Sequence, residues 1–200
     1  TLSLHDALPI CWRHPQLGQV PPVEFIPLAA SAVYRQTAAS DGIGDPLTFN
    51  VADNSFDLLS AGQLPDFSSA TFHVVIYNLG IPGANAYDAA SRASIAASGS
   101  STSHIKLAQS RKFPLPSPNN VLHIIPDQSV IYSCHDGKLL RSTQTLSTTL
   151  PTSCPQTGTL MADRVAQCGF FYNQGSTANT GLLSLRIALQ DKDEQLIIYR

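Results

Sequence analysis

Short apolar runs separated by prolines are the feature that most constrains the fold of this chain. Fourteen prolines are spread over 200 residues. A proline inside a helix removes a hydrogen bond and clashes with the preceding turn, so long helices are disfavoured. Between the prolines lie short runs rich in β-branched and aromatic residues, bounded by Gly, Asn and Asp, which is the pattern of strands. The sequence therefore predicts a mainly β fold.

Strands are predicted wherever such a run lies between turn residues. The predicted strands are residues 23–28, 47–51, 71–78, 104–107, 121–125, 130–135, 138–142, 168–172, 182–190 and 195–199.

Residues 182–190 have the clearest strand pattern. Apolar residues alternate there with Ser184, Arg186, Ala188 and Gln190, and a period of two places the two sets on opposite faces. The apolar set, which we expect to be buried, is Leu183, Leu185, Ile187 and Leu189. The polar residues 191–194 then form a turn, which predicts a C-terminal hairpin with residues 195–199.

A second hairpin is predicted at His135-Asp136-Gly137-Lys138. Asp-Gly between alternating strands suits a type I′ turn, in which both central residues have positive φ. Val130, Tyr132 and Cys134 are expected to share one face of its first strand.

One helix is predicted within residues 84–97, which are rich in alanine and bounded by Gly83 and Gly99. Residues 41–62 and 80–103 are predicted to be long loops. Loops of that length are usually functional or mobile, so either one is a candidate for contact with a partner.

The chain is predicted to form a single globular head over residues 11–200, because no internal repeat or domain boundary is visible. Residues 1–10 (TLSLHDALPI) look like translated sequencing adapter and are treated as a non-native artefact. Residues 195–200 stop in mid-strand, so we expect a chain truncated at both ends. No run reaches the roughly 18–20 apolar residues that span a bilayer, and any targeting segment is expected outside this chain.

The charge of the chain gives no reason to expect nucleic acid as a partner. Charged residues make up 13%, the formal net charge is −2, and Arg111-Lys112 is the one adjacent basic pair. A nucleic-acid surface would need a basic patch that follows the phosphates.

Motifs for catalysis or metal binding are missing from the sequence. No G-x-S-x-G nucleophile elbow and no glycine-rich phosphate loop occurs. His73, His104, His123 and His135 form no metal-ligand spacing, so they are expected to be hydrogen-bonded or exposed. The sequence therefore predicts no catalytic, cofactor-binding or metal-binding residue.

Calcium stays open as an alternative because four acidic residues cluster in sequence. The EF-hand order is absent, and turns favour aspartate in any case. The four are Asp41, Asp45, Asp53 and Asp57.

Four cysteines are present, and none falls in a C-x-x-C pair. Low charge and an even cysteine count favour an oxidising compartment. A Cys154–Cys168 bridge would restrict the unfolded chain by about 3 kcal/mol, so it is predicted, with Cys11–Cys134 as the other pair. Separately buried thiols are the alternative, and sequence alone permits three connectivities.

Several segments resemble one protein family, in the order expected for it. Residues 160–189 (LMADRVAQCGFFYNQGSTANTGLLSLRIAL) resemble the C-terminal part of MshO-type minor pilins of the MSHA type IV pilus. VIYSC at 130–134 with GKLLR at 137–141 is similar to a family hairpin, and VEFIPL at 23–28 to its opening. Residues 73–78 and 112–118 also follow the family order. The resemblance covers about residues 23–200.

The resemblance implies a pseudopilin-like fold of antiparallel sheets with long loops, an α+β family fold whose N-terminal helix is missing here. It implies a non-enzymatic head at the periplasmic face of the inner membrane, or at the pilus tip, of a Gram-negative bacterium. The implied partners are other minor pilins or pseudopilins, the pilus assembly machinery and, through the missing helix, the inner membrane. The implied role is structural, in the initiation of pilus assembly.

Other functions stay open. One is a type II secretion minor pseudopilin, whose head has similar strands. Another is a secreted β-rich hydrolase or a carbohydrate-binding module. A carbohydrate-binding sheet should carry several exposed aromatic residues, whereas the chain has one tryptophan, Trp12.

Overall fold

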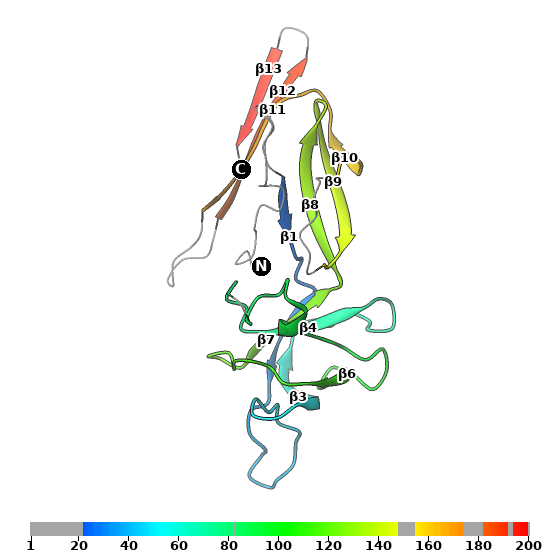
Figure 1. The fold of residues 1–200 in the computed structure, drawn as a ribbon, viewed down its shortest axis with the longest axis vertical. Helices are drawn as coiled ribbons and strands as arrows, with labels where there is room; N and C mark the ends of the chain where they lie inside the picture. The colour runs from blue at the N-terminus through cyan, green and yellow to red at the C-terminus, as the bar shows by residue number, and fades with distance from the viewer. Residues whose placement is uncertain (1–21, 82, 148–154, 174–181, 192–193, 200) are drawn as a thin grey trace. The chain divides into compact units, whose positions relative to one another are not determined.

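The structure is a computed structural model that describes residues 22–81, 83–147, 155–173, 182–191 and 194–199. Its regular structure is almost entirely antiparallel β-sheet, which confirms the mainly β prediction (Figure 1). The strands of the described residues are β1 (Val23–Phe25), β2 (Ala30–Tyr34), β3 (Asp53–Ala61), β4 (Phe72–Ile76), β5 (Arg92–Ser94), β6 (His104–Arg111), β7 (Val121–Pro126), β8 (Gln128–His135), β9 (Lys138–Thr145), β10 (Thr159–Ala162), β11 (Val165–Asn173), β12 (Leu182–Asp191) and β13 (Glu194–Tyr199).

The described residues group into two compact units. Unit 1 comprises Pro27–Asp127 and the described residues from Leu146. Unit 2 comprises the described residues up to Ile26, Gln128–Thr145, and those from residue 155 onward. Because the chain passes between the units four times from residue 22 onward, no single linker separates them, and a search for a boundary in the sequence finds none.

Unit 1 is a six-stranded antiparallel sheet in the order β5-β4-β7-β2-β3-β6. Its two ends meet, because Ile95 just after β5 forms a bridge with Leu107 of β6. Beside that bridge the Ala96 amide donates to the Lys106 carbonyl at 2.8 Å. The sheet thus closes into a barrel, an arrangement that leaves no free sheet edge at this join.

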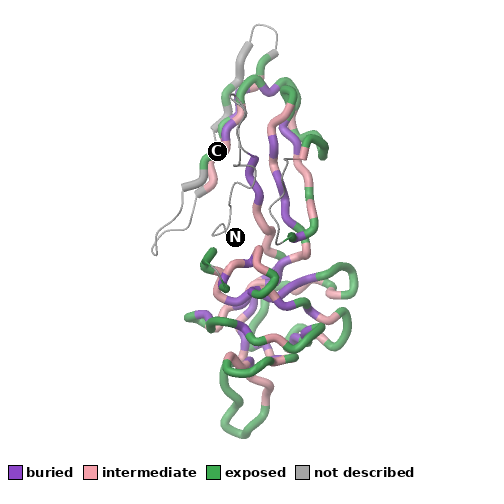
Figure 2. Tube along the Cα trace, in the orientation of Figure 1, coloured by how far each residue is buried: buried purple, intermediate pink, exposed green. Residues whose placement is uncertain are grey.

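The barrel encloses a single apolar core, drawn in purple in Figure 2. Alternation along the strands fills it, since every second residue of a strand points to the same face. β4 is buried along its whole length, with His73 and Val75 on the face opposite the core. The buried core residues are Ala30, Ala32, Tyr34, Leu47, Phe56, Leu58, Phe72, Val74, Ile76, Ala93, Ile95, Ile105, Leu107, Phe113, Leu122 and Ile124.

Unit 2 contains two sheets, β1-β8-β9-β10 and β11-β12-β13. A small cluster centred on Leu139, Val165 and Ile187 packs them together. The predicted β8–β9 hairpin is confirmed: His135 pairs with Lys138, and φ is 49° at Asp136 and 68° at Gly137, as a type I′ turn requires.

The predicted orientation of β12 is also confirmed. Ile187 is buried, with Leu185 and Leu189 packed beside it in the same cluster. Ala188 on the other face is also fully buried, which the alternation did not predict. The C-terminal hairpin forms as predicted, with Asp191 of β12 opposite Glu194 of β13.

The predicted helix over residues 84–97 is wrong. The segment contains one short 3-10 turn, η2 (Ala89–Ser91), capped by the Asp88 side chain, followed by strand β5. β5 pairs with β4 and helps to close the barrel. Intrinsic helix propensity is weak, and the sheet pairing outweighs it here.

The strand predictions failed where strands are short or mostly polar. The predicted strand 47–51 is irregular, although Leu47 is buried. β3 lies within the predicted loop 41–62. It was not predicted as a strand because only Phe56 and Leu58 of its residues are buried. β2, β5 and β10 were also missed.

Candidate functional site

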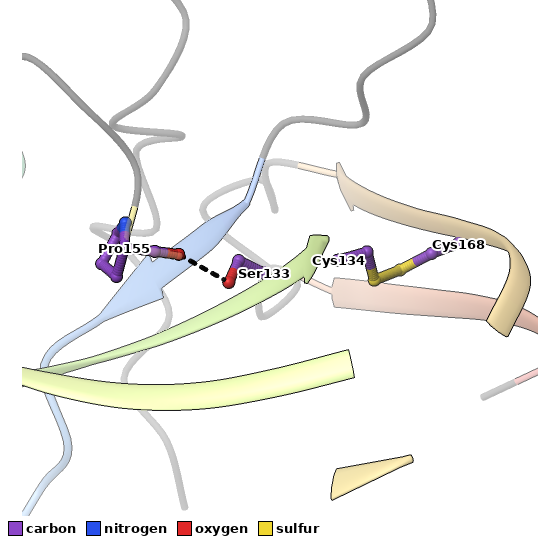
Figure 3. Close-up of a disulfide and its surroundings, with 4 residues drawn as sticks. All are labelled: Ser133, Cys134, Pro155 and Cys168. Atoms are coloured by element: carbon purple, nitrogen blue, oxygen red, sulfur yellow. Dashed lines mark hydrogen bonds between the residues drawn. A yellow bond between two sulfur atoms is a disulfide. The ribbon is translucent and has the colours of Figure 1, made fainter. Parts of the chain in front are cut away.

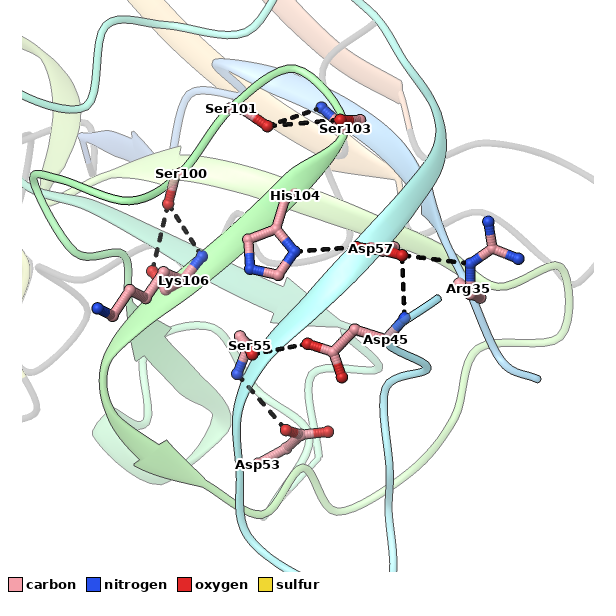
Figure 4. Close-up of polar contacts among 10 residues, drawn as sticks. All are labelled: Arg35, Asp45, Asp53, Ser55, Asp57, Ser100, Ser101, Ser103, His104 and Lys106. Carbon is pink, nitrogen blue, oxygen red and sulfur yellow. Dashed lines mark hydrogen bonds and ion pairs between the residues drawn. The ribbon is translucent and has the colours of Figure 1, made fainter. Parts of the chain in front are cut away.

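One polar cluster of unit 1 surrounds Asp57 of β3 and joins it to β6 and to the segment before β3 (Figure 4). Oδ1 of Asp57 is 2.9 Å from Nδ1 of His104, and Oδ2 of Asp57 accepts a hydrogen bond from the Asp45 amide at 2.9 Å. Arg35 Nε lies 3.5 Å from the same Oδ2. The hydrogen bond from His104, followed by that from the Asp45 backbone, lowers the pKa of Asp57 below its ordinary value of 3.8.

The acidic residues weighed for calcium bind protein donors instead. Asp45 Oδ2 accepts the Ser55 hydroxyl at 2.6 Å, and Asp53 Oδ2 accepts the Thr48 amide at 2.9 Å. Asp41 Oδ1 accepts the amide of the residue two positions on. Across the described part of the chain, no three His, Cys, Asp or Glu side chains are grouped to hold a metal ion. The geometry therefore does not favour the calcium alternative.

The Asp57 cluster holds the segment before β3 against the barrel. The Asp57 amide donates to the Asp45 carbonyl, and the Arg35 amide donates to the Asp57 carbonyl, both at 2.8 Å. Its Asp–His pair resembles two members of a catalytic triad. Among the described residues, however, no hydroxyl is hydrogen-bonded to the other ring nitrogen of His104. The cluster is therefore best read as an anchor for this segment.

A second histidine has both of its ring nitrogens engaged. His73 of β4 places Nε2 2.9 Å from Oδ1 of Asp127 and Nδ1 3.2 Å from Oγ of Ser94. His73 lies on β4, Ser94 on β5, and Asp127 directly after β7, and these three strands are neighbours in the barrel sheet. We refer to Ser94, His73 and Asp127 as the His73 relay.

The His73 relay was not predicted from the sequence. Its members are 21 and 54 positions from His73, and Ser94 belongs to no nucleophile motif. Only strand pairing joins them: His73 lies directly opposite Ser94, and the Asp127 amide donates to the Thr71 carbonyl at 3.0 Å. The relay could have been predicted from the sequence only with the correct strand order of the sheet.

His123 and His135, the other two histidines weighed as metal ligands, also have polar partners. His123 Nδ1 is 3.1 Å from Ser31 Oγ, and burial lowers the pKa of its imidazole below 6.5. His135 Nε2 lies 3.0 Å from a carboxylate oxygen of Asp136.

The disulfide predictions are wrong. Cys134 of β8 is bonded to Cys168 of β11, with Cα atoms 6.4 Å apart (Figure 3). Cys168 is therefore not paired with Cys154, nor Cys134 with Cys11; Cys11 and Cys154 lie outside the described residues. The predicted pairing was chosen from loop length, which affects only the entropy of the unfolded chain. The fold instead brings β8 and β11 together beside the cluster of Leu139, Val165 and Ile187.

A buried acid distinguishes unit 2. Glu24 of β1 is 2% exposed, and its two carboxyl oxygens lie 3.1 and 3.2 Å from Nε2 of Gln144 on β9. Burial raises the pKa of Glu24 above 4.5, and the hydrogen bond from Gln144 offsets part of that shift. The pKa of Glu24 therefore depends on how β1 packs in the sheet that contains β8 and β9.

Exposed apolar side chains gather on two segments of unit 1. Residues 36–52, which we call the β2–β3 loop, expose 69% of Ile43 and 57% of Val51. Leu79 and Ile81, between β4 and η2, are also exposed. The predicted loops 41–62 and 80–103 contain strands β3 and β5. The segments outside these strands are the parts that could contact a partner.

In the described residues, no helix is long and apolar enough to cross a membrane. Comparisons with protein-family models, with curated proteins and with solved structures gave no match.

Proposed function

We propose that this chain is the head of an MshO-like minor type IV pilin, which docks with neighbouring subunits and performs no catalysis in that role. The observation that carries the proposal is the placement of the family-like segments. Residues 130–134 and 137–141 lie on β8 and β9, and the segment 160–189 supplies β10, β11 and β12.

These segments, distant in sequence, pair within unit 2. Val23 of β1 lies opposite Tyr132 of β8, and Phe25 stacks on the Tyr132 ring with centroids 6.2 Å apart. Phe170 of β11 lies opposite Leu185 of β12. Residues 23–25, 130–134 and 137–141, with the described part of 160–189, therefore belong to unit 2, whereas residues 73–78 and 112–118, which also follow the family order, belong to unit 1.

The disulfide supports the proposed compartment. Disulfides persist in oxidising environments such as the bacterial periplasm and are rare in the cytosol. The Cys134–Cys168 bond is consistent with a head at the periplasmic face of the inner membrane or at a pilus tip.

Docking is proposed to use the β2–β3 loop. Ile43 and Val51 are large apolar residues that this segment leaves exposed, while the Asp57 cluster anchors its base. A preordered loop loses less conformational entropy on binding than a free one. The proposed occupants are other minor pilins of the assembly complex.

The test is complementation of a deletion strain with the full gene. The double variant Ile43→Ser/Val51→Ser should lower piliation and recovery of partner pilins at least fivefold, while the purified head keeps its unfolding midpoint. Ser40→Ala, on the same loop and exposed, is the matched control and should behave as wild type. Normal piliation and pull-down by the double variant would remove this loop from the proposal.

Gene context separates the pilin from its rivals. The complete reading frame should encode a cleavable hydrophobic helix ahead of residue 11, within a group of pilus biogenesis genes. A secretion operon would instead favour a type II minor pseudopilin. A gene without such a helix would contradict both and favour a secreted hydrolase or carbohydrate-binding module. Among the large apolar residues exposed in the described part, Phe171 is the aromatic one, which gives a carbohydrate-binding face little support.

A further inference from the structure

The His73 relay has the arrangement that activates a serine. A nucleophile, a base within hydrogen-bond reach of it, and a third group that orients the base form the general signature of nucleophilic catalysis. Here Ser94, His73 and Asp127 take those three positions at 3.2 and 2.9 Å.

The partners of the ring fix the direction of the relay. An ionised carboxylate only accepts hydrogen bonds, so the Nε2 that faces Asp127 carries the proton. Nδ1 then has its lone pair directed at Ser94, and the serine hydroxyl donates to it. A base in this form can take the serine proton when Oγ attacks. The nitrogens are used in the opposite sense to the serine protease triad, in which Nε2 faces the serine.

The surroundings hold the relay in place and leave its serine accessible. Ser94 is exposed, whereas His73 is 7% exposed, so the base is shielded while the nucleophile faces solvent. Arg92 lies two residues before Ser94 on the same face of β5, and its charge interacts favourably with Asp127. Its Nη1 donates to the Ala86 carbonyl at 3.0 Å, which fixes the guanidinium.

We propose that Ser94 is an activated nucleophile that accepts an acyl group from esters, with His73 as its base and Asp127 as a positioning residue. Ser94 Oγ bonds to the carbonyl carbon of the ester while its proton passes to Nδ1 of His73. The carbon–oxygen bond to the alcohol then breaks, and His73 returns the proton to the departing alkoxide. The products are an acyl-serine and a free alcohol. This acyl transfer is independent of docking, since the relay includes no residue of the β2–β3 loop.

The experiment uses the full chain and a fluorophosphonate probe, which forms a phosphoserine-type adduct and releases fluoride. Fragmentation mass spectrometry should place the adduct on Ser94, at a rate at least tenfold above Ser110. Ser110 is an exposed serine on β6 and serves as the internal reference. p-Nitrophenyl acetate should acetylate the same residue. Absence of an adduct on Ser94, while a known serine hydrolase reacts in the same tube, would overturn the proposal.

Variants separate activation from simple exposure. Ser94→Ala should abolish the adduct at that position, and His73→Gln should reduce labelling of Ser94 to the rate of Ser110. Asp127→Asn should reduce it as well, and Asp127→Glu should restore part of it. Histidine ring nitrogen NMR should show the proton on Nε2 in the wild type and on Nδ1 in Asp127→Asn, because the amide donates to Nε2. Circular dichroism confirms that each variant is folded. Undiminished labelling in folded His73→Gln would show that the relay does not activate Ser94.

Discussion

The two units of this chain are stabilised in different ways. Unit 1 closes its sheet into a barrel around a large apolar core. Unit 2 keeps two separate sheets, joined among the described residues by a cluster whose buried members are Leu139, Val165 and Ile187, and by the Cys134–Cys168 bond. Apolar burial contributes roughly 25 cal/mol per Å². The comparison teaches that the barrel of unit 1 is held by packing and strand pairing, whereas the two sheets of unit 2 are also joined by a covalent bond.

Phe56→Ala should have the largest effect on the barrel. The side chain is fully buried in the core of unit 1, and removing such a ring costs about 3–5 kcal/mol through lost burial and the cavity left behind. Chemical denaturation followed by hydrogen exchange should show the loss in β2–β7. The exposed Leu59→Ala on the same strand is the control and should change stability by less than about 0.5 kcal/mol. A small effect at Phe56 would mean that the barrel core is misassigned.

Removal of the disulfide should act on unit 2 alone. The bond spans 34 positions, for which the chain-entropy estimate is about 3–4 kcal/mol. In the double variant Cys134→Ser/Cys168→Ser, hydrogen exchange should quicken in β11, β12 and β13 and stay unchanged in β4 and β7. Peptide mapping of the non-reduced wild type should link the peptides that contain Cys134 and Cys168. Equal loss of protection in both units would contradict the comparison.

Glu24→Gln should stabilise unit 2 at neutral pH by about 1 kcal/mol, since it removes a buried charge and keeps a hydrogen-bonding side chain. The folded pKa of Glu24 is raised above 4.5, so the folded state holds the extra proton. Stability of the wild type therefore falls as pH rises from about that value through the folded pKa. Glu24→Gln should abolish this slope, measured as the denaturation midpoint against pH.

Asp57 of unit 1 provides the control of opposite sign. Its pKa is lowered below 3.8, so its contribution is present above that pH and is lost as pH falls through the folded value. Asp57→Asn should flatten only the acidic part of the curve of unfolding free energy against pH. The change should be under about 1 kcal/mol, because the carboxylate is partly exposed to solvent. The same slope in both variants would refute the assigned directions.

Features set by neighbouring residues could be predicted from the sequence, and those set by tertiary pairing could not. The Asp136-Gly137 turn and the buried face of Ile187 depend on local chemistry and alternation, and both are confirmed. β3 was missed because Phe56 and Leu58 are its only buried residues, too few for a visible pattern. The Cys134–Cys168 bond and the His73 relay depend on which strands become neighbours, which no spacing in the sequence encodes.

The interleaving of the two units has a consequence for the order of folding. Unit 1 is nearly one continuous stretch, Pro27–Asp127, and it can assemble as soon as that stretch has been synthesised. β1 emerges earlier, yet Val23 must wait for Tyr132, more than a hundred residues later, before it can pair. Contacts so distant along the chain form slowly. Until β8 has been made, β1 therefore stays an unpaired strand while unit 1 is already folded, and a chaperone or a neighbouring subunit could bind it at that stage.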